Sequence, residues 1–152
     1  MKRLHVHISV PNLSQAINFY NQMFAESPTK QKEDYAKWQL EDPAVNFAIS
    51  TRGNKTGLDH LGIQVSSEEE LNQINERLNT AQIDAGKIEN TTCCYAESVK
   101  SWSFDPAGIP WESFITMKDA DAYGTDTDNI SSSQTNCCPG AAPQQSTGAS
   151  CC

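Results

Sequence analysis

Apolar and polar residues alternate over positions 4–10, where every second residue is Leu, Ile or Val and the polar positions include His5 and His7. This alternation predicts a half-buried β-strand with two histidines on its polar face. A helix is predicted next, because Asn12 can cap it and apolar side chains recur at helical spacing over 13–24. The first element pair is therefore a strand followed by an amphipathic helix.

The same order of elements is predicted twice. The later elements are strands at 34–40 and 44–50, a strand at 57–65, a helix capped by Ser66 with Glu69 and carrying Leu71, Ile74 and Leu78, and strands at 83–89, 98–104 and 111–117. Turns are predicted wherever Asp-Pro interrupts the pattern. The fold class predicted is α+β, with two tandem units of about 3–51 and 57–118.

The two predicted units can be laid on each other. The strand at 5–10 matches the strand at 60–65, so that His5 falls opposite His60 and His7 falls opposite Gly62. The strands at 44–50 and 111–117 share an isoleucine, at positions 49 and 115, and counting back from it places Glu112 opposite Asn46. Two equivalent units predict a shared cleft between them.

His5, His60 and Glu112 are the candidate metal ligands of that cleft. Two neutral imidazoles and one carboxylate with open coordination positions form the ligand set of non-haem Fe(II) oxygenases. Because asparagine is a weak ligand, Asn46 predicts three protein ligands and open positions, which favours redox chemistry over isomerisation. In the alternative reading the histidines are hydrogen-bonded core residues and Glu112 is a surface glutamate, while His7 either supports the ligands or is exposed.

All six cysteines occur as adjacent pairs, at Cys93-Cys94, Cys137-Cys138 and Cys151-Cys152. A disulfide between neighbours closes almost no loop, so such pairs make poor structural crosslinks. They favour binding of a thiophilic metal or metalloid, or redox chemistry. Because neighbouring side chains of a regular strand face opposite sides, a loop or bulge is predicted for residues 91–95.

Composition limits the remaining possibilities. A net charge of −8, with no run of lysine or arginine, argues against nucleic-acid binding. No apolar run approaches the roughly 20 residues that span a bilayer, and the N-terminus is too polar for a secretory signal, so a cytoplasmic protein with reduced thiols is expected. Residues 119–152 are poor in apolar side chains and are predicted to form a disordered tail after a domain at 1–118.

The repeated unit and the closing run Asp105–Glu112 (DPAGIPWE) resemble the vicinal oxygen chelate superfamily, which includes glyoxalase I, extradiol dioxygenases and bleomycin-resistance proteins. The resemblance covers roughly residues 3 to 118. Within it, the Thr-Cys-Cys-Tyr-Ala run at 92–96 is similar to the ArsI-type carbon–arsenic lyases, also known as cadmium-induced CadI proteins. Further similar runs are Phe19-Tyr20, Pro28–Lys30, Asp34–Ala36, Asp59–Gly62 and Pro110–Glu112.

The resemblance implies Fe(II)- and O2-dependent cleavage of the carbon–arsenic bond in trivalent organoarsenicals, with methylarsenite or aromatic arsenicals as substrates and arsenite as product. His5, His60 and Glu112 match the metal positions, and Cys93 with Cys94 match the thiols that bind arsenic. Tyr95 either shapes the pocket or is a packed aromatic. The alternatives are a protein that only sequesters arsenic or cadmium, and an extradiol-type dioxygenase.

Two further expectations concern the tail and the assembly. The pairs Cys137-Cys138 and Cys151-Cys152 could capture arsenicals and pass them to Cys93 and Cys94, because a flexible tail raises the local thiol concentration near the cleft. A homodimer is the candidate assembly, with no nucleic-acid or membrane partner.

Overall fold

The computed structural model describes residues 1–53 and 55–120, so the predictions for Cys137, Cys138, Cys151 and Cys152 lie outside the described residues. The elements are β1 (Arg3–Ser9), α1 (Leu13–Phe24), β2 (Lys30–Gln31), β3 (Tyr35–Leu40), β4 (Val45–Ser50), β5 (Gly57–Gln64), α2 (Glu68–Thr80), β6 (Glu89–Cys93), β7 (Ala96–Phe104) and β8 (Pro110–Asp119). β8 extends one residue beyond the predicted domain boundary at 118.

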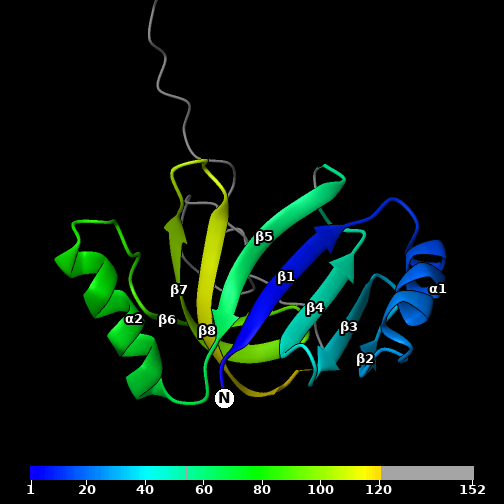
Figure 1. The fold of residues 1–152 in the computed structure, drawn as a ribbon, viewed down its shortest axis with the longest axis horizontal. Helices are drawn as coiled ribbons and strands as arrows, with labels where there is room; N and C mark the ends of the chain where they lie inside the picture. Colours follow the sequence, from blue (N-terminus) through cyan, green and yellow to red (C-terminus); the bar gives the residue numbers. More distant parts are fainter. Residues whose placement is uncertain (54, 121–152) are drawn as a thin grey trace, which may run out of the picture.

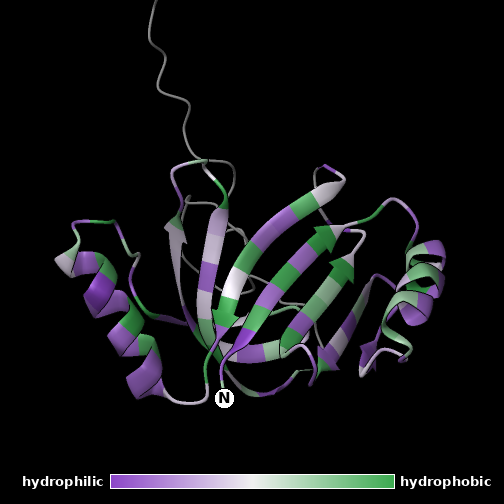
Figure 2. Cartoon of the chain, viewed as in Figure 1, coloured by the Kyte–Doolittle hydropathy of each residue, from purple (hydrophilic) through white to green (hydrophobic). Residues whose placement is uncertain are grey.

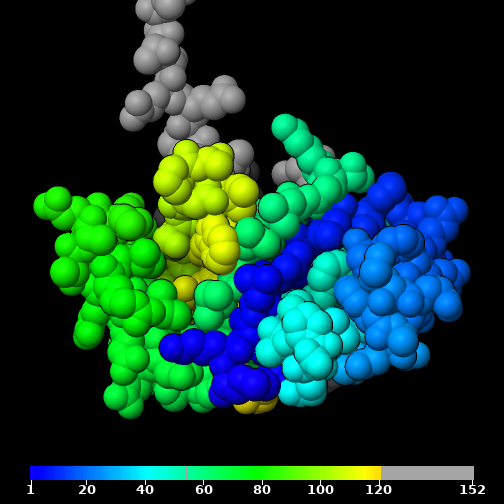
Figure 3. Space-filling view, viewed as in Figure 1, coloured from blue at the N-terminus to red at the C-terminus, as the bar shows by residue number. Residues whose placement is uncertain are grey.

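The strands form one curled eight-stranded sheet in the order β2-β3-β4-β1-β5-β8-β7-β6, shown in Figure 1. β1 and β5 pair antiparallel at its centre, and each pairs in parallel with the last strand of its own unit, β4 or β8. From either edge inward, the strands are the second, third, fourth and first of one unit. This symmetric order confirms the predicted two βαβββ units. In the space-filling view the two units lie side by side and meet along β1 and β5 (Figure 3).

The central register explains how the units are related. His5 lies opposite Gly62, and His7 lies opposite His60. Exchanging each residue for its counterpart in the other unit turns the first pair into the second, as a two-fold axis between β1 and β5 requires. The predicted equivalence of His5 and His60 is therefore realised in the pairing of the sheet.

The helices cover the outer face of the sheet and leave the inner face for polar side chains. Alternation along the strands, visible as stripes in Figure 2, separates the two faces. The side chains that pack between α1 and its unit are Leu13, Ile17, Ala36, Trp38, Leu40, Phe47 and Ile49, with Val6 and Ile8 against them. His5 and His7 point the other way, so the concave face holds the candidate site. Among the described residues, neither helix has the length and apolar character needed to cross a membrane.

Both helix starts are capped. The Asn12 side chain accepts a hydrogen bond from the backbone of Gln15 at 2.9 Å, as predicted. The second cap was predicted one residue too early. Ser67 accepts from the backbone of Glu70, whose carboxylate accepts from the backbone of Ser66, because α2 begins at Glu68.

The strand predicted at 83–89 was wrong. Residues 83–88 form an extended connection that touches β7 through a hydrogen bond from Gly86 N to Trp102 O, 2.8 Å long. The strand of this region is β6, which begins only at Glu89 and pairs with β7 through a tight hairpin. The tight hairpin fixes the register of β6 against β7, and the weak apolar pattern at 83–88 does not.

Candidate metal and thiol site

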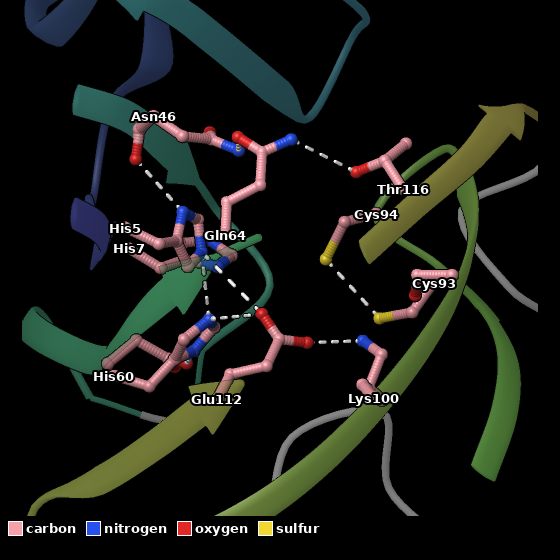
Figure 4. Close-up of polar contacts among 12 residues, drawn as sticks. His5, His7, Asn46, His60, Gln64, Cys93, Cys94, Lys100, Glu112 and Thr116 are labelled. Atoms are coloured by element: carbon pink, nitrogen blue, oxygen red, sulfur yellow. Dashed lines mark hydrogen bonds and ion pairs between the residues drawn. The ribbon is translucent and has the colours of Figure 1, made fainter. Parts of the chain in front are cut away.

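The concave face holds a small cavity of about 40 Å3. It is lined by residues of both units, namely His5, His7, Tyr35, Lys37, Asn46, His60, Cys93, Cys94, Ala96, Ser98, Lys100, Glu112, Phe114 and Thr116. The candidate ligands and the candidate thiols, 18 residues or more apart in the sequence, therefore face one space (Figure 4).

His5 and His60 point their Nε2 atoms at each other across 3.1 Å. Their Nδ1 atoms are held from behind, His5 by the backbone oxygen of Asn46 at 2.9 Å and His60 by the carboxylate of Asp59 at 2.6 Å. Both partners are acceptors, so each neutral imidazole carries its proton on Nδ1 and turns a lone pair toward the other. Two buried lone pairs that face each other fit a bound cation.

Glu112 completes a triangle with these histidines. Its Oε2 lies 3.9 Å from His5 Nε2 and 3.7 Å from His60 Nε2. Ligands about 2.0–2.2 Å from one ion lie roughly 3–4 Å from each other, so these three atoms fit a divalent metal. The other oxygen, Oε1, accepts a hydrogen bond from the buried ammonium of Lys100.

The electrostatics keep these groups in metal-binding form. Burial lowers the pKa of His5 from 6.5 to about 4, although the negative charge of Glu112 acts to raise it. The imidazole is therefore neutral near pH 7. Burial acts to raise the pKa of Glu112, but Lys100 and the two histidines outweigh it and hold that pKa at about 2. The carboxylate is therefore ionised.

Asn46 and Glu112 are not register counterparts, contrary to the count along the repeat. In β4, Ala48 lies beside His7. In β8, Glu112 lies beside Gly62, the residue of β5 that corresponds to His7, so the counterpart of Glu112 is Ala48. Glu112 therefore lies two residues further along its strand than the counterpart of Asn46. Asn46 lies beside His5 and presents its backbone oxygen to that imidazole.

His7 is 2% exposed and lies on the inner face of β1. Its Nε2 is 3.0 Å from Ser50 Oγ, while its Nδ1 is buried and has no hydrogen-bond partner among the described residues. One ligand nitrogen from each of His5, His7 and His60 lies within 4.8 Å of the others. Burial lowers the pKa of His7 to about 3.

Cys93 ends β6, and Cys94 with Tyr95 forms the two-residue turn of the β6–β7 hairpin. Both turn residues have positive φ, 56° and 60°, which is the geometry of a type I′ turn. The region is thus mostly strand, and the predicted loop is limited to the turn. The left-handed backbone brings the two thiols together, with 3.3 Å between the sulfurs.

Contacts with the first unit hold this hairpin tip. The Tyr95 hydroxyl donates to Asp34 Oδ1 at 2.6 Å, and Lys30 Nζ donates to the backbone oxygen of Tyr95 at 2.7 Å. The Tyr95 ring packs at 5.7 Å from that of Tyr35. Positive φ costs about 1–2 kcal/mol per non-glycine residue, so the surrounding contacts must maintain the turn.

Sequence reasoning missed three residues that orient the candidate ligands. Lys100 was predicted only as part of a strand, although an inward lysine in a half-buried strand indicates a buried counter-ion. Asp59 precedes His60 directly, but the contact between neighbouring side chains depends on rotamers. Ser50 ends β4 and reaches His7 only because β4 pairs with β1.

The fold defines the class of protein. Similar solved structures include the Mn(II)-bound glyoxalase from Novosphingobium aromaticivorans, with TM-score 0.55 and 13% identity over 84% of this chain and 44% of that chain. An extradiol ring-cleaving dioxygenase from B. fuscum has TM-score 0.55 and 14% identity over 78% of this chain and 34% of that chain. This is the vicinal oxygen chelate fold; at these identities the likeness concerns the fold alone.

No protein-family model matches the chain, but curated relatives identify its family. A trivalent organoarsenical cleaving enzyme from Bacillus sp. (strain MD1) is 38% identical over 100% of this chain and 99% of that protein. The cadmium-induced protein CadI of Mycobacterium tuberculosis (strain ATCC 25618 / H37Rv) is 31% identical over 92% of this chain and 95% of that protein. The chain belongs to the family of trivalent organoarsenical cleaving enzymes and CadI proteins.

Proposed function

We propose that this protein is an Fe(II)- and O2-dependent enzyme that cleaves the carbon–arsenic bond of trivalent organoarsenicals and releases arsenite. One observation carries the proposal: two neighbouring thiols, with sulfurs 3.3 Å apart, line the same cavity as His5, His60 and Glu112 (Figure 4). The family relationship to organoarsenical cleaving enzymes supports it. Methylarsenite and trivalent aromatic arsenicals are the proposed substrates.

Cys93 and Cys94 would hold the substrate. As(III) is soft and binds thiolates, and two sulfurs this close can bridge one arsenic atom. Two As–S bonds form while the two hydroxyl groups of the arsenical leave as water with the thiol protons. The organic group then remains on arsenic and projects into the cavity.

His5, His60 and Glu112 would hold the metal, since their lone pairs converge and the set matches the two-histidine, one-carboxylate ligands of non-haem iron oxygenases. Iron(II) bound there would supply the redox chemistry with O2 that the protein's own side chains lack. With methylarsenite as substrate, one molecule each of CH3As(OH)2 and O2 would give one molecule each of As(OH)3 and formaldehyde.

The chain's own contribution is positioning. Lys100 binds one oxygen of Glu112 and so turns the other toward the histidines. Burial lowers the pKa of Lys100, but the charges of Glu112 and Cys93 outweigh this effect and raise it above its usual value, so the ammonium stays charged. Holding both reactants in one cavity removes much of the entropic barrier.

Metal exchange tests the proposal. Metal-free protein reconstituted with Fe(II) should release arsenite from methylarsenite in air and none under argon. Turnover restored by Zn(II) or Ni(II) without oxygen would instead indicate glyoxalase-like Lewis-acid chemistry. Tight arsenical binding without arsenite release under any of these conditions would identify a sequestering protein, and ring cleavage of a catechol would identify an extradiol dioxygenase.

Three further parts of the proposal stay predictions. They are a cytoplasmic location, a homodimeric assembly, and arsenic capture by Cys137, Cys138, Cys151 and Cys152, which lie outside the described residues.

A further inference from the structure

His7 is a buried histidine that the three-ligand site leaves unused. It lies two residues after His5 on the same face of β1 and is the direct cross-strand partner of His60. Its ring centroid is 4.8 Å from that of His60 and 6.3 Å from that of His5. Three imidazoles thus cluster on two neighbouring strands inside the cavity.

In each of the three imidazoles, a hydrogen-bond partner holds one ring nitrogen. His5 is held by the backbone oxygen of Asn46, His60 by Asp59, and His7 by Ser50 Oγ at 3.0 Å from its Nε2. Metal-binding histidines almost always donate their second ring N–H to such a partner, which fixes both tautomer and orientation.

The free nitrogen of His7 is its Nδ1, which is buried without a hydrogen-bond partner among residues 1–53 and 55–120. A buried polar atom left unsatisfied costs about 1–3 kcal/mol. Such a cost needs a compensating ligand, and the neighbouring imidazoles of His5 and His60 show which kind, because one ring nitrogen of each of the three histidines lies within 4.8 Å of the others. A divalent cation satisfies all three nitrogens together.

We infer that His7 is a third histidine ligand, which binds through Nδ1 while its Nε2–H donates to Ser50. The inference rests on the proposed metal centre and changes its composition, from two histidines and one carboxylate to three histidines and Glu112. Ligands at ~2.1 Å on opposite sides of an ion are ~4.2 Å apart, so a small side-chain movement closes the set. A six-coordinate ion would keep two positions for exchangeable ligands.

Counting coordinated imidazoles tests this directly. In anaerobic protein loaded with one Co(II), each neutral bound imidazole keeps one ring N–H, which gives one strongly shifted exchangeable proton signal in the NMR spectrum. We expect three such signals in the wild-type protein and two in His7→Leu, with Co(II) affinity lower by ~10–100-fold in the variant. Ser50→Ala should shift one of the three signals.

The matched control is Tyr20→Phe, which changes an aromatic side chain of the first unit's outer core that does not line the cavity and offers no ring nitrogen. It should keep three signals and the wild-type affinity. Two signals in the Co(II)-loaded wild-type protein would overturn the role of His7 and leave the three-ligand centre standing, whether or not the variant folds. A wild-type protein that binds no Co(II) would overturn the proposed metal centre itself.

Discussion

Cys93 and Cys94 illustrate how much depends on single side chains in this site. Cys93 is 2% exposed, whereas Cys94 is partly accessible. The left-handed backbone at Cys94 turns its side chain toward that of Cys93, which a regular strand would not do. The two sulfurs are therefore already side by side, as the proposed two-point binding of arsenic requires.

Cys93→Ser should abolish this two-point binding. We expect affinity for phenylarsine oxide to fall by at least ~10²-fold, because the second thiol acts at high effective concentration only while the first is bound. The measurement is a fluorescence or calorimetric titration in a background where Cys137, Cys138, Cys151 and Cys152 are serine, so that other thiols do not mask the loss. Unchanged affinity in both Cys93→Ser and Cys94→Ser would contradict the thiol clamp.

Lys100 offers a stability prediction at the same scale. Its ammonium and the Glu112 carboxylate form a pair in which each side chain is 6% exposed. Removing one partner of a buried pair leaves the other charge unpaired, so Lys100→Met should lower the free energy of unfolding of the metal-free protein by about 3–5 kcal/mol.

The control for that variant is Lys118→Met, which breaks a pair with Glu97 whose side chains are 66% and 44% exposed. Solvent screens such pairs, so the change should stay below about 1 kcal/mol in urea denaturation. Equal losses in the two variants would show that Lys100 does not neutralise Glu112.

At the scale of elements, the periodic parts of the chain were predictable and the hairpin that carries the thiols was not. Alternation in β1 and helical spacing in α1 report burial directly, so both were predicted within a residue or two. The β6–β7 turn uses Cys94 and Tyr95 where type I′ turns normally use asparagine and glycine. No local signal marks it, because contacts with a distant strand maintain it.

The Tyr95 hydroxyl should matter for that reason. Tyr95→Phe removes its hydrogen bond to Asp34 but keeps the ring, so we expect stability to fall by about 0.5–1.5 kcal/mol. Affinity for phenylarsine oxide should fall as the turn loosens, while Co(II) affinity should be unchanged. Tyr20→Phe, in the first unit's outer core, is the matched control and should leave arsenical affinity at the wild-type value.

For the candidate site, the sequence repeat predicted His5, His60 and Glu112 as ligands, the adjacent cysteines predicted a thiophilic site, and the family resemblance gave both groups a role in one reaction. The orienting contacts of Lys100, Asp59 and Ser50 depend on sheet register and rotamers, which no short pattern encodes. The register also corrected the pairing of Glu112 with Asn46.

At the scale of the whole molecule, acid should destabilise the metal-free protein. Burial lowers the pKa of His5 from 6.5 to about 4 and that of His7 from 6.5 to about 3. Between pH 6.5 and about 4, these imidazoles therefore take up protons in the unfolded chain but stay neutral in the folded protein. Stability rises with pH wherever the unfolded state binds more protons, so it should fall steadily as pH is lowered from about 7 to about 4.

Urea denaturation of metal-free protein across that pH range checks the prediction. His7→Leu removes one of the two histidines with lowered pKa, so its stability should depend less steeply on pH than that of the wild type. A flat profile in the wild-type protein would mean that these imidazoles are not neutral and buried in the folded state.

The central claim is that thiol pair and metal ligands act on one arsenical in one cavity. Its most direct test is arsenic speciation after incubation of Fe(II)-loaded protein with methylarsenite in air, with formaldehyde measured in parallel. The account predicts arsenite and formaldehyde in equal amounts from the wild-type protein, and neither above background from Cys93→Ser or His60→Ala. Methylarsenite recovered intact from the wild-type protein, or arsenite released equally well by both variants, would contradict it.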